Sequence, residues 1–107
     1  MLKIELIEGR YRPIITCDWC EKPIAEATAG NYEYEVGGDG RPRDGAAFFT
    51  HTECCRAFEE AHGGPGRWRM DDLRCLPPQL GASLGLDWDE AARLCGPGGP
   101  PLGGAWP

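Results

Sequence analysis

The chain has 107 residues, with 17 acidic side chains against 11 Lys and Arg, so its formal net charge is −6. This length supports one compact domain, and the negative charge disfavours nonspecific binding to nucleic acid or anionic membranes, because both require clustered cationic side chains. No segment has the roughly 18 to 20 consecutive apolar residues of a membrane-spanning helix, and acidic residues interrupt the start of the chain, where a secretory signal would be apolar. The sequence therefore predicts a cytoplasmic protein without a membrane partner, in which cysteines stay reduced.

The first third of the chain predicts strands. Leu2, Ile4 and Leu6 alternate with charged residues, which is the period of a half-buried strand, and residues 11–16 form a second extended stretch. Residues 31–36 alternate aromatic and acidic side chains, so we expect a third strand there with its aromatic rings on one face.

This third strand is expected to belong to a hairpin that is followed by a helix. The glycine, proline and aspartate content of residues 37–45 predicts a loop, and residues 46–50 are the predicted return strand. Thr50 and Glu53 have the spacing of a capping box, and apolar residues then recur at helical spacing as far as Ala61. A glycine-rich segment after Ala61 is expected to end the helix.

The rest of the chain predicts a short strand at residues 67–70 and two short helices. Residues 77–84 begin with two prolines, which suit the first turn of a helix. Asp87 is positioned to cap a second helix over residues 88–94.

Four residues have the types and the spacing of zinc ligands. Cys17 and Cys20 form a C-x2-C pair, and His51 and Cys54 form an H-x2-C pair, with thirty residues between Cys20 and His51. Two intervening residues let both side chains of a pair turn toward one point, from a tight knuckle in the first pair and from the first turn of a helix in the second. Three thiolates and one imidazole in tetrahedral array suit structural zinc. The sequence therefore predicts one zinc ion per chain at this site.

All four coordination positions of the predicted site are filled by the protein. Catalytic zinc keeps one position open for water, so the predicted zinc is structural. The sequence also lacks a Ser/His/Asp set, a phosphate-binding glycine loop and an H-E-x-x-H helix. We therefore expect a binding module and not an enzyme.

The predicted order of knuckle, hairpin and helix resembles the treble-clef plan of zinc domains. The spacing C-x2-C-x30-H-x2-C resembles that of the zinc fingers of poly(ADP-ribose) polymerases, and residues 17–24 and the aromatic pair before His51 are similar in character to that family. LIM domains share both ligand pairs but have a shorter spacer and a second zinc module, which this chain lacks. The resemblance to the polymerase fingers implies recognition of DNA breaks. The acidic charge of this chain favours a shared scaffold over a shared function.

Together these patterns predict an α+β fold built on a treble-clef-like zinc domain with two short C-terminal helices. Residues 1–66 are the expected zinc-binding module, and residues 67–95 are expected to form a helical extension packed on it. Residues 96–107 are expected to be a disordered tail, because they are mostly glycine and proline.

The leading functional prediction is a regulatory or adaptor module that binds another protein. Trp19, Trp68 and Trp88 are the candidate contact residues, because tryptophan is enriched at interface anchors, although at least one of them is expected in the core. The alternative is a nucleic-acid-binding regulator. It would use the finger with Arg41 and Arg43, or the helix-turn-helix-like segment over residues 79–94.

Three cysteines lie outside the predicted ligand set. Cys55, Cys75 and Cys95 have no paired spacing, so we expect them to be reduced and outside the metal shell. A disulfide between Cys75 and Cys95 is the alternative.

Overall fold

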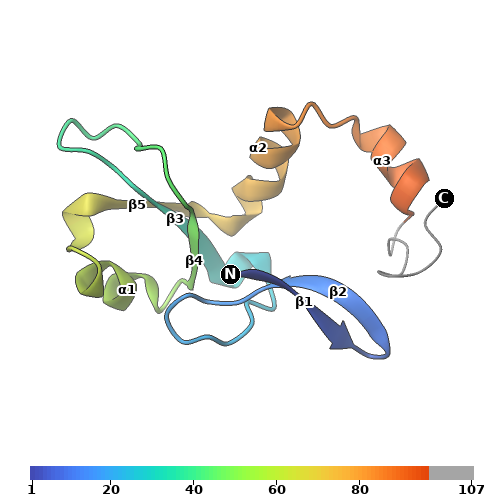
Figure 1. The fold of residues 1–107 in the computed structure, drawn as a ribbon, viewed down its shortest axis with the longest axis horizontal. Helices are drawn as coiled ribbons and strands as arrows, with labels where there is room; N and C mark the ends of the chain where they lie inside the picture. Colours follow the sequence, from blue (N-terminus) through green and yellow to red (C-terminus); the bar gives the residue numbers. More distant parts are fainter. Residues whose placement is uncertain (97–107) are drawn as a thin grey trace.

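The computed structural model describes residues 1–96, which fold into two antiparallel sheets and three short α-helices (Figure 1). The predicted α+β class is confirmed. In chain order the strands and helices are β1 (Leu2–Ile7), β2 (Arg10–Ile15), β3 (Gly30–Glu35), β4 (Phe48–His51), α1 (Cys55–Ala61), β5 (Trp68–Asp72), α2 (Leu76–Ser83) and α3 (Trp88–Cys95). The tail predicted over residues 96–107 lies, from residue 97 onward, outside the described residues.

β1 and β2 form a two-stranded hairpin of their own, paired along the whole length of both strands. The two connecting residues, Glu8 and Gly9, have positive φ angles of 51° and 78°, as a type I′ turn requires. Glycine adopts this backbone without steric cost, and the turn follows the natural twist of the strands. The turn points away from the second sheet (Figure 1).

The second sheet has the strand order β4-β3-β5, and both outer strands run antiparallel to β3. The predicted hairpin of β3 and β4 is confirmed. The alternation of aromatic and acidic residues along β3 predicted one buried face, but side chains on both faces of this strand are buried. Tyr32 is buried, and its hydroxyl donates a hydrogen bond of 2.9 Å to Gln79 in α2. Glu33 points to the opposite face and is fully buried as well. The central strand is therefore covered on both faces.

An aromatic cluster forms the core between α1 and this sheet. The ring of Phe58 lies 5.5 Å from that of Phe48 and 5.1 Å from that of Trp68, and the pair of Phe48 and Trp68 meets edge to face at 5.7 Å. The indole N–H of Trp68 donates to the carbonyl oxygen of His62 at 2.9 Å, so its polar group is satisfied inside the core. Trp68 is only 8% exposed. Its prediction as a partner contact is therefore wrong.

The predicted capping box before α1 is also wrong. Thr50 lies within β4, and its hydroxyl donates a hydrogen bond of 3.0 Å to Oε2 of Glu33. The residue before the helix is Cys54, whose side chain makes no capping hydrogen bond. The buried carboxyl group of Glu33, on another strand, thus accepts the hydrogen bond of the hydroxyl that the local spacing assigned to the helix.

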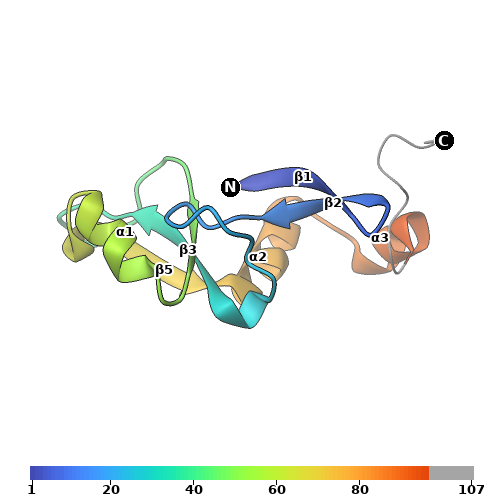
Figure 2. The same cartoon turned by 90° about the horizontal axis from the view of Figure 1, so that it is seen from below.

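The two C-terminal helices follow the sequence prediction closely. The Asp87 carboxylate accepts a hydrogen bond of 3.1 Å from the backbone N–H of Glu90 and caps α3 as expected. The ring of Trp88 lies against Gly81 of α2, where a larger residue would not fit. No side chain of α3 is buried, and both views show α3 beyond α2, away from the second sheet (Figures 1 and 2). Within residues 1–96, no helix is both long and apolar enough to cross a membrane.

Candidate metal centre

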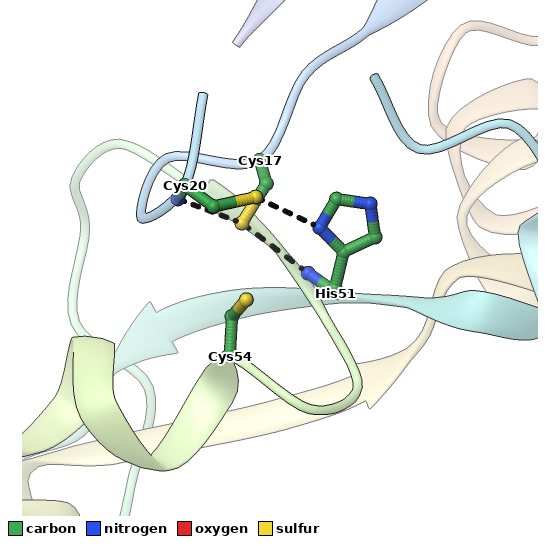
Figure 3. Close-up of side chains that lie close together, drawn as sticks. All are labelled: Cys17, Cys20, His51 and Cys54. Atoms are coloured by element: carbon green, nitrogen blue, oxygen red, sulfur yellow. Dashed lines mark hydrogen bonds between the residues drawn. The ribbon is translucent and has the colours of Figure 1, made fainter. Parts of the chain in front are cut away.

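The four predicted ligands come together at one point (Figure 3). Cys17 and Cys20 lie in the knuckle that follows β2, His51 ends β4, and Cys54 precedes α1. One ligand atom from each residue lies within 4.8 Å of the other three. Residues that are more than thirty positions apart in the sequence therefore form a single cluster of three sulfurs and one imidazole.

The backbone of the knuckle is arranged to hold Cys17 as a thiolate. The N–H groups of Trp19, Cys20 and His51 donate to Sγ of Cys17 at 3.4, 3.5 and 3.4 Å. Burial by itself raises the pKa of the Cys17 thiol, but these backbone donors outweigh it and lower the pKa to about 6. Cys17 is therefore ready to ligate a metal ion near neutral pH.

The imidazole of His51 has a fixed orientation. Its Nε2 lies 3.0 Å from the carbonyl oxygen of Pro23, which can only accept a hydrogen bond, so Nε2 carries the proton. Nδ1 is then the free nitrogen, and it lies 3.3 Å from Sγ of Cys20 within the cluster. A carbonyl that orients a histidine through its second nitrogen is the usual outer shell of a metal ligand.

The knuckle is attached to β4 by a set of short hydrogen bonds. The backbone N–H of Asp18 donates to the carbonyl oxygen of Phe49 at 2.6 Å, and the Asp18 carboxylate accepts from the N–H of Phe49 at 2.8 Å. The N–H of Cys54 donates to the carbonyl oxygen of His51 at 2.9 Å. These bonds fix the positions of both ligand pairs relative to each other, so the cluster is set by backbone as well as by side chains.

The dimensions and the charge of the cluster fit a zinc ion. Zinc–sulfur bonds of about 2.3 Å place the sulfurs of a tetrahedral centre about 3.8 Å apart, so the cluster would need to contract by no more than about 1 Å. Burial raises the pKa of the Cys54 thiol to about 12, and the neighbouring sulfurs of Cys17 and Cys20 contribute to the rise. Thiolates held this close together repel one another, and a bound dication would offset that repulsion. Metal binding would therefore release protons from the cysteine thiols.

A buried carboxyl pair between β3 and α1 escaped the sequence analysis. Glu33 is fully buried, Glu59 is 9% exposed, and Oε1 of Glu33 is buried without a hydrogen-bond partner. Burial, followed by the nearby Glu59 carboxyl, raises the pKa of Glu33 from 4.5 to about 8. No local signal marks such a residue, because the covering helix comes from elsewhere in the chain.

The raised pKa of Glu33 makes the folded state dependent on pH. Between about pH 4.5 and pH 8 this group holds a proton in the folded state and releases it in the unfolded state. Glu33 therefore lowers the free energy of unfolding as pH rises through this window, by up to about 1.4 kcal/mol per pH unit.

The remaining residues that the sequence singled out are dispersed over the surface. Trp19 in the knuckle is 45% exposed, and Trp88 on α3 is 56% exposed. Arg41 and Arg43 lie in the loop between β3 and β4, where the backbone N–H of Arg41 is held by the carboxylate of Asp39 at 3.0 Å. The structure thus keeps two of the three predicted tryptophans at the surface and places them on separate elements.

The other cysteines lie outside the cluster. Sγ of Cys55 donates to the carbonyl oxygen of Thr52 at 3.2 Å, and burial raises the pKa of this thiol. Cys75 and Cys95 are exposed, and both are free thiols in the structure.

Comparison of the chain with known proteins found no matching family model, no matching curated protein and no matching solved structure. Function must therefore be inferred from the residues and the geometry of this chain.

Proposed function

We propose that this chain is a zinc-stabilised module that binds another protein. The observation that carries the proposal is the convergence of Cys17, Cys20, His51 and Cys54, within 4.8 Å of one another, from three separate segments. One zinc ion on these ligands would join the knuckle, β4 and α1. In a domain with so few buried side chains, such a centre supplies stability that apolar packing does not.

The proposed zinc is structural. Three sulfurs and Nδ1 of His51 would fill all four positions of a tetrahedral zinc ion and leave none for a substrate or a reactive water. We propose the treble-clef plan for this arrangement, because a knuckle and a β-hairpin precede a helix and the last ligand, Cys54, lies directly before that helix. The likeness to poly(ADP-ribose) polymerase fingers is proposed only for this scaffold.

A protein is the proposed partner. Trp19 and Trp88 offer large exposed aromatic surfaces of the kind that anchor interfaces. The helix-turn-helix form of the nucleic-acid alternative gains no support, because the first turn of α3, which would enter the groove, carries Asp89 and Glu90 and is capped by Asp87. The free thiols outside the cluster fit a reducing compartment, so we propose a cytoplasmic location.

Cobalt substitution tests the metal centre directly. Titration of the reduced chain with Co²⁺ should saturate at one equivalent, with the charge-transfer absorption of thiolate ligands and the strong ligand-field bands of a tetrahedral ion. Cys20→Ser should lose part of the charge-transfer absorption, whereas Cys75→Ser, which changes an exposed cysteine outside the cluster, should leave the spectrum unchanged. Weak octahedral bands, or equal effects of the two substitutions, would contradict the proposed centre.

The proposed partner class is tested by affinity capture from the native host, with Trp19→Ala and Trp88→Ala as companions. A protein that is retained by the zinc-loaded chain and lost with either variant, at unchanged zinc content, supports the proposal. A salt titration with duplex, nicked and single-stranded DNA is the opposing test. Tight binding with a steep salt dependence, abolished by changing Arg41 and Arg43 together, would favour the nucleic-acid alternative.

A further inference from the structure

The outer edge of β1 is an unpaired strand edge with a defined set of hydrogen-bonding groups. Met1 and Thr16 exchange two main-chain hydrogen bonds, of 2.6 and 2.8 Å. Because these bonds alternate along an antiparallel pair, the N–H and C=O groups of Leu2, Ile4 and Leu6 point away from β2. No hydrogen bond to these outward groups is present within residues 1–96.

The opposite edge of the hairpin is closed to such pairing. Pro13 occupies an outward position of β2 and has no N–H to donate, and the carbonyl of Ile15 already accepts a hydrogen bond of 2.8 Å from Ile24. Proline and covering segments are the usual protection of sheet edges. Within residues 1–96, β1 has neither, and Figure 2 shows it at the margin of this part of the chain with β2 between it and α2. Leu2, Ile4 and Leu6 are 65%, 53% and 59% exposed.

The sequence of β1 is complementary to itself. We propose that two copies of the chain associate by antiparallel pairing of their β1 strands around a twofold axis at Ile4. In this register Leu2 faces the partner's Leu6, and Ile4 faces the partner's Ile4, so that all the outward main-chain groups are paired. Lys3 then faces the partner's Glu5, and the same pair recurs on the other side of the axis.

Charge selects this register over its neighbours. A shift of two residues in one direction would place Lys3 opposite the partner's Lys3, and a shift in the other direction would place Glu5 opposite the partner's Glu5. Like charges directly opposite each other destabilise a strand pair, whereas opposite charges stabilise it. Lys3 and Glu5 already form an ion pair of 3.0 Å within one chain, so the dimer extends this pair into a four-charge network.

This inference names a second copy of the chain as the protein that binds β1. It rests on the proposed function only because it treats the chain as a protein-binding module. Sedimentation equilibrium of the zinc-loaded full chain should show a monomer–dimer equilibrium. Lys3→Glu or Glu5→Lys alone should weaken association about tenfold or more, because each creates like-charge pairs on both sides of the axis. Arg56→Glu is the matched control for Lys3→Glu, since it makes the same change in net charge at an exposed site on α1.

Charge exchange then tests the register. An equimolar mixture of the Lys3→Glu and Glu5→Lys chains, and the chain that carries both substitutions, should regain dimerisation. Ile4→Pro, which copies the edge protection of Pro13, should abolish it. A chain that is monomeric up to about 1 mM, or a dimer that neither charge reversal affects, would overturn the inference, as would a β1 edge occupied by a different protein. Zinc content, measured for every variant, separates this failure from a failure of the metal centre.

Discussion

Loss of a single ligand is expected to unfold the N-terminal module. Cys17→Ser removes one of three sulfurs and also the acceptor of three backbone N–H groups. A structural zinc of this type contributes about 10–16 kcal/mol at neutral pH, which is comparable to the about 5–15 kcal/mol by which a typical domain is stable.

The apolar core is too small to compensate for that loss. Apart from Cys17, the buried apolar side chains of the described residues are Tyr32, Phe58, Trp68 and Leu73. At about 1.5–3 kcal/mol for each buried side chain, their burial amounts to about 6–12 kcal/mol before the cost of ordering the chain is subtracted. Removal of the metal should therefore leave the knuckle, β4 and α1 without a stable fold.

The assay combines metal analysis with thermal unfolding followed by near-ultraviolet circular dichroism. Cys17→Ser, or treatment of the unmodified chain with a chelator, should remove zinc and the cooperative transition together. Cys75→Ser, at an exposed position, should keep one zinc per chain and an unchanged transition. A Cys17→Ser chain that retained stoichiometric zinc and an unaltered melting temperature would refute the assignment.

Three further substitutions test the packing. Glu33→Gln should abolish the fall in stability of the zinc-saturated chain between about pH 4.5 and pH 8, because it removes the group whose pKa is raised to about 8. Chemical unfolding at several pH values measures the free energy of unfolding of both chains. Parallel plots of this free energy against pH would contradict the prediction. Trp68→Ala should cost about 3–5 kcal/mol in the same assay, against less than about 0.5 kcal/mol for Trp19→Ala, and similar losses would show that burial of Trp68 was misjudged. Gly81→Ala should displace Trp88, because the new methyl group would lie 2.5 Å from its ring; faster hydrogen exchange in α3 at unchanged zinc content is expected, and unchanged exchange would argue against this contact.

Much of the local structure could be predicted because short-range patterns decide it. The position of β1, the two-residue gap in each ligand pair and the capping of α3 by Asp87 are properties of neighbouring residues, and the structure confirms each of them. The half-burial that the alternation in β1 predicted is wrong, because Leu2, Ile4 and Leu6 are all exposed. The set Cys17, Cys20, His51 and Cys54 could be named as one cluster because the chemistry of zinc requires four such ligands together.

The errors arose where a distant segment decides the environment of a residue. Thr50 has the local spacing of a helix cap, but its hydroxyl donates a hydrogen bond to the buried carboxyl group of Glu33. Trp68 is of a residue type that often anchors interfaces, but its ring packs against Phe48 and Phe58 in the core. Neither partner is adjacent in sequence, so no local pattern could reveal these contacts.

The sequence by itself therefore determined the four candidate metal ligands and the extent of most strands and helices, because ligand spacing and backbone periodicity act over a few residues. The tertiary structure decided the strand order β4-β3-β5, the burial of Glu33 and the exposure of the β1 edge. These features depend on which strands and helices pack against one another. The free energy that stabilises this packing comes from contacts between residues far apart in the chain.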